Sequence, residues 1–288
     1  MESQKKYSPT FSFECYSPKT PEAIANLQNA QLELASLKPD FFSVTYGAGG
    51  STRNMTFETV LDIREKTGFE SVPHISCIGN YNDEINAMLQ SYIDNDIKQI
   101  VVLRGDLPSG TVGYGQYQHA NELVEFIRKQ TGDHFNIEVA AYPEFHPQAA
   151  SPKVDIDNFK RKVDAGANGA ITQYFFNPFS YYRFIDHCEK LNINIPIVAG
   201  VMPITNCTQL VRFSEGCGAE IPRWVLKQLQ GFGDDRESIF KFGVDVVTEL
   251  CDQLLSNGAP GLHFFTMNKS AASIAIWKNL GLDKRTIK

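Results

Sequence analysis

Short segments rich in apolar and β-branched residues recur along the chain, and helix-forming segments fill the intervals between them. Most of the short segments are continuously apolar, which is typical of strands buried on both faces of a parallel sheet. There are eight, at Thr10–Cys15, Phe41–Tyr46, Val72–Cys77, Gln99–Leu103, Ile137–Tyr142, Ala170–Phe175, Ile195–Val201 and Leu262–Thr266. The sequence therefore predicts eight strands connected through helices.

The intervals show helical periodicity together with residues that start and end helices. They predict helices at Pro21–Leu37, Thr56–Thr67, Asp83–Asn95, Ala120–Thr131, Ile156–Ala165, Tyr181–Leu191 and Ser238–Ser256. Thr20 precedes its helix as a cap, and Gly68, Gly132 and Gly166 follow predicted helix ends. Strand and helix thus alternate, and βα units of this kind build a parallel sheet.

The spacing of the strands favours a closed barrel. Strand starts lie roughly thirty residues apart up to the seventh, and roughly sixty separate the seventh from the eighth, with extra helices predicted near 208–214 and 222–229. The alternative is an open doubly wound sheet, which usually carries a glycine-rich phosphate loop. Residues Gly47–Thr52 resemble such a loop but lack its final glycine. We predict an α/β fold, a (β/α)8 TIM barrel with extra helices between strands seven and eight, as a single domain over residues 1–288.

Composition and charge exclude several classes of function. The chain has 288 residues and a formal net charge of -6, which argues against nucleic acid as a partner. Its six cysteines form no CxxC pair, so neither a zinc ribbon nor a redox dithiol is indicated. No apolar stretch approaches the ~18 residues of a membrane span, and the first residues lack the apolar core of a secretion signal. We expect a cytoplasmic protein without a membrane partner.

Polar side chains stand where nearly every predicted strand ends. They are Glu14, Thr45, Tyr46, His74, Ser76, Arg104, Asp106, Tyr142, Glu144, His146, Thr172, Gln173, His263 and Thr266. Barrel enzymes build their sites at the carboxyl ends of the strands, so these side chains should converge on one cavity. One such residue is more often structural than catalytic, but a ring of them predicts an active site.

Two carboxylates in this ring are candidates for acid–base chemistry. Glu14 ends an apolar strand, where a carboxyl keeps its proton more readily than in water, which suits a general acid. The alternative is an ion pair of Glu14 with Arg104 or Lys19. Asp106 can stand on the opposite wall, unless Arg104 merely neutralises it. The histidine and acid spacings match no compact ligand motif, so we predict no metal, and no strand carries the inward lysine that a Schiff-base aldolase needs.

After the fifth strand, Asp155, Asn158, Arg161 and Lys162 follow one another at helical spacing. They place an acid, an amide and two cations along one helical face near the start of the helix. This is either a solvated face or a site at which Arg161 and Lys162 meet a pyrophosphate. In the second case a dinucleotide can bind without a Rossmann turn.

Nine motifs, in order, make the chain similar to the methylenetetrahydrofolate reductase family in its bacterial form. They are Phe11–Glu14, Ser43–Ala48, Pro73–Cys77, Leu103–Pro108, Ala140–Glu144, Lys160–Asn168, Ile171–Phe176, Gly200–Ile204 and His263–Asn268. The resemblance implies a barrel that binds FAD and reduces 5,10-methylenetetrahydrofolate to 5-methyltetrahydrofolate, with NADH or NADPH as co-substrate, in methyl supply for methionine synthesis. It also implies a homo-oligomer, a tetramer or a dimer, and no regulatory domain.

Carried over residue by residue, the resemblance implies where each ligand binds. The FAD site comprises Thr45, Tyr46, Ala48, His74, Arg104, Gly105, Asp106, Ala120, Tyr142, His146, Ala149, Asp155, Asn158, Arg161 and Lys162. Glu14 matches the general acid, and Asp106 is the second catalytic residue. Asp106, Gln173, Gln209 and Lys269 match positions that contact folate, and Phe213 matches an aromatic residue that stacks against both substrates.

The chain departs from the family pattern at three places. Cys15–Pro18 stands where Phe-Phe-Pro-Pro is usual, and His119 replaces a tyrosine near the adenosine part of FAD. Lys269 replaces an arginine, which keeps the charge but loses a two-pronged grip on the glutamate tail of folate. The rival interpretations are another barrel enzyme, such as a proline dehydrogenase-like flavoprotein or a pterin-binding methyltransferase, and a noncatalytic flavin- or pterin-binding protein.

Overall fold

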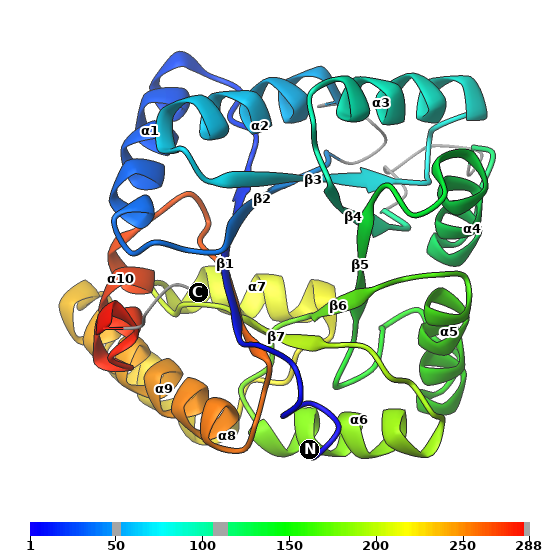
Figure 1. The fold of residues 1–288 in the computed structure, drawn as a ribbon. Helices are drawn as coiled ribbons and strands as arrows, with labels where there is room; N and C mark the ends of the chain where they lie inside the picture. Colours follow the sequence, from blue (N-terminus) through cyan, green and yellow to red (C-terminus); the bar gives the residue numbers. More distant parts are fainter. Residues whose placement is uncertain (48–52, 106–114, 285–288) are drawn as a thin grey trace.

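In the computed structural model, which describes residues 1–47, 53–105 and 115–284, parallel strands pair in sequence order and close into a barrel. The strands are β1 (Thr10–Tyr16), β2 (Phe41–Thr45), β3 (Glu70–Ser76), β4 (Gln99–Leu103), β5 (Asn136–Ala141), β6 (Gly169–Thr172), β7 (Ile197–Val201) and β8 (Gly261–Phe265). β1 closes the ring, because Ser12 lies opposite both Phe41 of β2 and His263 of β8. Figure 1 shows this ring with helices around it. The predicted barrel is confirmed.

The helices connect successive strands on the outside of the ring (Figure 1). They are α1 (Pro21–Ala35), α2 (Arg53–Thr67), α3 (Asn82–Asp94), α4 (Ala120–Thr131), α5 (Pro152–Asp164), α6 (Pro178–Lys190), α7 (Cys207–Cys217), α8 (Arg223–Gly231), α9 (Arg236–Ser256) and α10 (Ala271–Asn279), followed by the 3-10 turn η2 (Leu282–Lys284). The predicted cap is present, since Thr20 accepts a hydrogen bond from the backbone of Ala23. α7 and α8 are the extra helices expected between the last two strands.

Several predicted bounds are off by a few residues, and two larger differences separate the structure from the prediction. α10 was not predicted, because its Ala271–Trp277 stretch, apolar except for Ser273, lacks the alternation of polar and apolar residues that identifies a surface helix. The sixth strand was predicted to run to Phe175, but β6 ends at Thr172. Residues 173–176 leave the sheet and enter the loop above it, although they are as apolar as a strand.

Apolar side chains pack in two separate regions. The larger region lies between the strands and the helices, where Phe13 contacts Phe42, Phe264 and Trp277. The smaller lies among inward-facing residues of the strands and contains Phe41, Val72, Val101 and Ile171, with Leu103 against them. Because each strand is covered on both sides, the continuous apolar pattern follows directly from the barrel.

One carboxyl lies among these inward-facing residues. Glu138 of β5 pairs with Val101 and Gly169 in the register of the sheet. Its Oε1 is 3.4 Å from Asn136 Nδ2, and its buried Oε2 has no hydrogen-bond partner in the described structure. A Cβ on Gly169 would lie 2.4 Å from this oxygen, so the glycine makes room for the carboxyl. Burial raises the pKa of Glu138 from 4.5 to about 7.

We expect Glu138→Gln to stabilise the protein more at pH 8 than at pH 5. The folded wild type holds the Glu138 proton up to its raised pKa of about 7, so its stability falls as pH rises from about 4.5 to 7. Glutamine stays neutral at every pH. Above pH 7 the variant's free energy of unfolding should therefore exceed that of the wild type by at most about 3 kcal/mol. Urea unfolding at both pH values measures it. The control is Glu125→Gln on the exposed side of α4, and an equal effect of Glu138→Gln at both pH values would contradict the expectation.

Candidate active site

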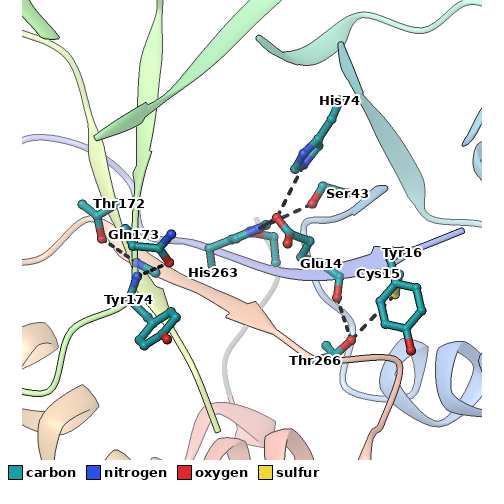
Figure 2. Close-up of polar contacts among 12 residues, drawn as sticks. Glu14, Cys15, Tyr16, Ser43, His74, Thr172, Gln173, Tyr174, His263 and Thr266 are labelled. Carbon is teal, nitrogen blue, oxygen red and sulfur yellow. Dashed lines mark hydrogen bonds and ion pairs between the residues drawn. The ribbon is translucent and has the colours of Figure 1, made fainter. Parts of the chain in front are cut away.

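Glu14 of β1 lies between two histidines at the mouth of the barrel. Its side chain is 18% exposed, and its Oε2 is 3.4 Å from His263 Nε2 and 3.5 Å from His74 Nε2 (Figure 2). Within the described residues Glu14 forms no ion pair with Arg104 or Lys19, so the alternative role predicted for it is not observed. The carboxyl therefore lines the cavity, and no lysine or arginine of the described residues forms an ion pair with it.

The ring of His263 forms a hydrogen bond with Ser12 on the side away from Glu14. The sequence placed this histidine at a strand end, but it lies within β8 and is fully buried. Its Nδ1 is 2.6 Å from Ser12 Oγ on β1, and its Nε2 is 3.5 Å from Ser43 Oγ on β2. When the Ser12 hydroxyl donates to Nδ1, the proton of the neutral ring is on Nε2 and points toward Glu14. The same ring cannot also accept a proton from Glu14 at Nε2 in that tautomer.

His74 of β3 is buried and neutral. Burial lowers its pKa from 6.5 to about 4, against the smaller opposite effect of Glu14 and with a further small contribution from His263. The 3.5 Å contact with Glu14 lacks hydrogen-bond geometry, and both ring nitrogens are without a hydrogen-bond partner among the described residues. A buried polar group in this state is stabilised by a ligand that supplies the missing bond.

Hydrogen bonds of two threonine hydroxyls to the backbone fix the strand ends beside Glu14 and Gln173. Thr266 donates its hydroxyl to the carbonyl oxygen of Glu14 at 2.6 Å, which fixes the end of β1 against the segment after β8 (Figure 2). Across the barrel, Thr172 Oγ1 accepts the backbone N–H of Gly200 at 2.9 Å. Gln173 follows at once, and its Oε1 accepts the N–H of Tyr174 at 2.9 Å. The early end of β6 therefore brings Gln173 into the mouth.

Four cavities adjoin at this end of the barrel. The central cavity, about 200 Å³, is lined by Glu14, Thr45, Tyr46, His74, Val101, Leu103, Ala140, Tyr142, Ile171, Thr172, Gln173 and Phe265. The outer cavity, about 530 Å³, shares Glu14, Tyr142, Gln173 and Phe265 with it and adds Phe213, Arg212 and Met267. Tyr142 also lines a flank cavity, and Arg212 also lines a cationic cavity. The shared lining residues show that the four cavities lie next to one another.

The flank cavity, about 290 Å³, lies beside β4 and β5. Of the predicted dinucleotide-binding residues, it is lined by Arg104, Gly105, Ala120, Tyr142, His146, Ala149, Asp155, Asn158 and Lys162. His119 lines it too, at the position where the sequence departs from the family pattern. The Asp155 carboxylate accepts the N–H of His146 at 2.9 Å, which ties the start of α5 to the loop after β5.

Lys162 brings a partly buried positive charge to the flank cavity. Its ammonium donates to the carbonyl oxygen of Ala140. Burial lowers the pKa of Lys162 from 10.5 to about 8, partly offset by Asp155, and Arg104 lowers it slightly further. Arg161 was predicted on the same face, but its exposed side chain lies outside the lining and donates to Asn158 Oδ1 at 3.0 Å. Of the two predicted cations, only Lys162 lines the described cavity.

The cationic cavity, about 640 Å³, joins three separate segments. Gln209 and Arg212 come from α7, Arg236 from the start of α9, and Lys269 from the loop after β8. The three cations form no ion pair within the described part of the chain, and Asp234 is the acid in the lining. An anionic part of a ligand is favoured here.

Two predicted site residues, Ala48 and Asp106, lie outside the described residues. Sequence reasoning missed Ser12 and Phe265, although both sit on the inward positions of their strands, two residues from Glu14 and His263 respectively. Alternation along each strand is the signal that could have found them. In the described ranges no group of three or more His, Cys, Asp or Glu residues could hold a metal ion, and no helix has the length and apolarity to cross a membrane.

Comparison with known proteins identifies one family to which the chain is similar. The family model described as methylenetetrahydrofolate reductase matches residues 1–281. The 5,10-methylenetetrahydrofolate reductase of Escherichia coli (strain K12) is 41% identical over 271 residues, which are 94% of this chain and 90% of that protein. Methylenetetrahydrofolate reductase (NADH) 1 of Arabidopsis thaliana is 35% identical over 94% of this chain and 48% of that protein.

A solved structure has a similar fold. It is an uncharacterized protein from Clostridium thermocellum that binds two copies of 5-methyl-5,6,7,8-tetrahydrofolic acid. The two chains align with a TM-score of 0.66 and 15% sequence identity, over 98% of this chain and 96% of the other. At that identity the likeness extends to the barrel fold alone.

We expect Ser12→Ala to cost about 1–3 kcal/mol of stability, because it leaves Nδ1 of the buried His263 without a partner. The matched control is Ser43→Ala, which removes an equally buried hydroxyl that is 3.5 Å from the other ring nitrogen. It should cost less, since 3.5 Å is beyond the usual hydrogen-bond length. Urea unfolding measures both, and equal losses would show that the Ser12 contact has no special weight.

Proposed function

The chain belongs to the methylenetetrahydrofolate reductase family, and from this premise we propose that it reduces 5,10-methylenetetrahydrofolate to 5-methyltetrahydrofolate, using a nicotinamide reductant and bound FAD. The observation that carries the proposal is the position of Glu14, which lines both the central and the outer cavity. The presence of this carboxyl at the cavities also argues against a noncatalytic binding protein. Family membership also argues against the proline dehydrogenase-like and methyltransferase alternatives.

The residues of the flank and central cavities fit FAD. A pyrophosphate needs cationic and amide donors, and Lys162, Arg104 and Asn158 line the flank cavity together. The partly buried Lys162 has a lowered pKa, so an anion beside it removes an electrostatic cost. His74 lines the central cavity, and its ring nitrogens have no hydrogen-bond partner among the described residues. When bound, FAD supplies a ring that accepts and donates hydride.

We assign the FAD site to the residues that the family resemblance gave. They are Thr45, Tyr46, Ala48, His74, Arg104, Gly105, Asp106, Ala120, Tyr142, His146, Ala149, Asp155, Asn158, Arg161 and Lys162. All the described ones except Arg161 line the flank or the central cavity, which supports the assignment. The role of Arg161 is then indirect, through the side chain of Asn158.

Glu14 acts in this proposal as the proton donor to the folate. Protonation of folate nitrogen-10 makes it a better leaving group, so that the five-membered ring opens to an electrophilic iminium at nitrogen-5. His263, whose Nε2 faces the carboxyl, orients Glu14 toward the cavity. Asp106 is the second catalytic carboxylate of the proposal, where it would stabilise the positive charge of the iminium.

The rest of the folate is proposed to extend from the central into the cationic cavity. Gln173 lines the central and outer cavities, Phe213 the outer one, and Gln209 and Lys269 the cationic one. Lys269 replaces a family arginine, but Arg212 and Arg236 line the same cavity. The negative charge of a glutamate tail therefore meets several cations, which offsets the loss of one two-pronged contact.

Three further parts of the proposal stay predictions. The co-substrate is NADH or NADPH, the product serves methionine synthesis, and the enzyme works as a homo-oligomer in the cytoplasm. The Arabidopsis relative is named for NADH, and nothing in the described cavities separates the two nicotinamides.

Glu14→Gln should strongly slow folate reduction while the bound flavin is still reduced by NADH or NADPH. The amide keeps the shape of the side chain but cannot give up a proton as an acid, and loss of a general acid costs roughly 10²–10⁴-fold in rate. Anaerobic stopped-flow absorbance measures the two half-reactions separately. The control is Glu22→Gln, an exposed residue in the first turn of α1. If the variant reduces folate as fast as it oxidises nicotinamide, Glu14 is not the acid.

Binding of FAD to the apoprotein should weaken as pH rises above about 8, where Lys162 loses its charge. The sign follows from the lowered pKa, because the cation that binds phosphate is present below about 8 and lost above it. Lys162→Arg stays charged and should remove this dependence, and Lys160→Arg on the exposed side of α5 serves as control. Fluorescence titration between pH 6.5 and 9.5 measures the affinities; an unchanged pH profile in Lys162→Arg would exclude this lysine.

A further inference from the structure

Two aromatic side chains are exposed beside one groove on the outside of the barrel. Phe179 is 72% exposed and Trp224 is 60% exposed. Both line a groove of about 380 Å³, here called the aromatic groove, whose apolar lining also includes Phe176, Pro222, Val246 and Leu250. Single exposed aromatics are ordinary on protein surfaces, but two beside one apolar groove are typical of an interaction site.

The aromatic groove is independent of the proposed active site. It lies where α6, α8 and α9 gather on one side of the barrel (Figure 1). None of its lining residues lines the central, outer, flank or cationic cavity. A role in the reductase chemistry therefore does not account for its exposed aromatic surface.

The positive and negative charges beside the groove lie on two different helices. α8 carries Arg223 and Lys227, one helical turn apart and both exposed, and contains no acidic residue. The second half of α9 carries Asp245, Glu249 and Asp252, also exposed and on one face, and residues 242–256 contain no lysine or arginine. Within the described structure none of these five side chains forms an ion pair. Glu249 also lines the groove itself.

A surface with a basic helix next to an acidic one is complementary to itself. When two copies of the chain are related by a two-fold axis, the same patch of each copy contacts that of the other in antiparallel orientation. In this arrangement α8 of each chain faces α9 of the other. A foreign partner of a single charge sign would be attracted by one helix and repelled by the other. The arrangement of charges thus favours a second copy of this chain over another occupant.

We propose that the aromatic groove and the helices beside it form a two-fold interface between copies of this chain. Trp224 of each copy enters the groove of the other, and Lys227 faces the partner's Glu249. Aromatic residues buried at the centre of such contacts usually carry most of the binding energy, while charges at the rim set the orientation. The proposal names the contact face and does not depend on which reaction the barrel performs.

The first test measures the self-association of Trp224→Ser by sedimentation velocity over a range of protein concentrations. We expect the dissociation constant to rise by about tenfold or more relative to wild type. Tyr81→Ser is the matched control, because Tyr81 is 61% exposed and lies at the start of α3. Circular dichroism confirms that both variants are folded. A wild type that is monomeric throughout, or an unchanged constant in Trp224→Ser, would overturn the proposal.

The second test uses reversed charges. Lys227→Glu and Glu249→Lys should each weaken self-association. In a dimer of either variant, both of the contacts between positions 227 and 249 are between like charges. An equimolar mixture of the two variants should associate at least as well as wild type, since both contacts in the mixed dimer are again between opposite charges. Lys129→Glu on α4 gives the same change of net charge away from the groove and should leave association unchanged. Failure of the mixture to associate would place any interface elsewhere.

Discussion

The pairing of β1 with β8 is the constraint on which the site depends. It closes the barrel, and its register sets Ser12 beside His263 and Glu14 beside Phe265. A shift of one residue would turn Glu14 toward the helices and bring Phe13 into the barrel. The aromatic cluster of Phe13, Phe264 and Trp277 on the outer side opposes that shift, because it is buried only in the observed register. Apolar packing on one face of β1 thus fixes the polar chemistry on its other face.

The eight strands could be predicted from the sequence because both their faces are buried, which leaves a continuous apolar signal. Their ends were less predictable. Phe175 and Phe176 are buried, yet they belong to a loop that packs over the barrel, so burial alone does not distinguish them from a strand. The helical face on α5 was partly right. Arg161 follows Asp155 by six positions, which at 3.6 residues per turn puts it roughly 120° away from that residue.

The partners of the site residues could not be predicted, because they come from distant segments that only the closed sheet brings together. For Glu14 an ion pair with Arg104 or Lys19 was the alternative to a general acid, but its neighbours are His74 from β3 and His263 from β8. Likewise, Gln209, Arg236 and Lys269 share a cavity although three separate helices and loops carry them. Composition and local spacing carry no record of such long-range contacts. The family resemblance pointed to Glu14, His74, Gln209 and Lys269, and each of these side chains lines one of the adjoining cavities.

Glu138 and Gly169 form a pair whose sizes are coupled. The carboxyl occupies the space that a side chain at position 169 would need, so a change at one position restricts what the other can accept. In related chains the two positions should therefore co-vary, with any residue larger than glycine on β6 accompanied by a shorter one on β5. A relative without the acid at position 138 could accept a larger residue at position 169. Comparison of related chains would then show which of the two positions was substituted first.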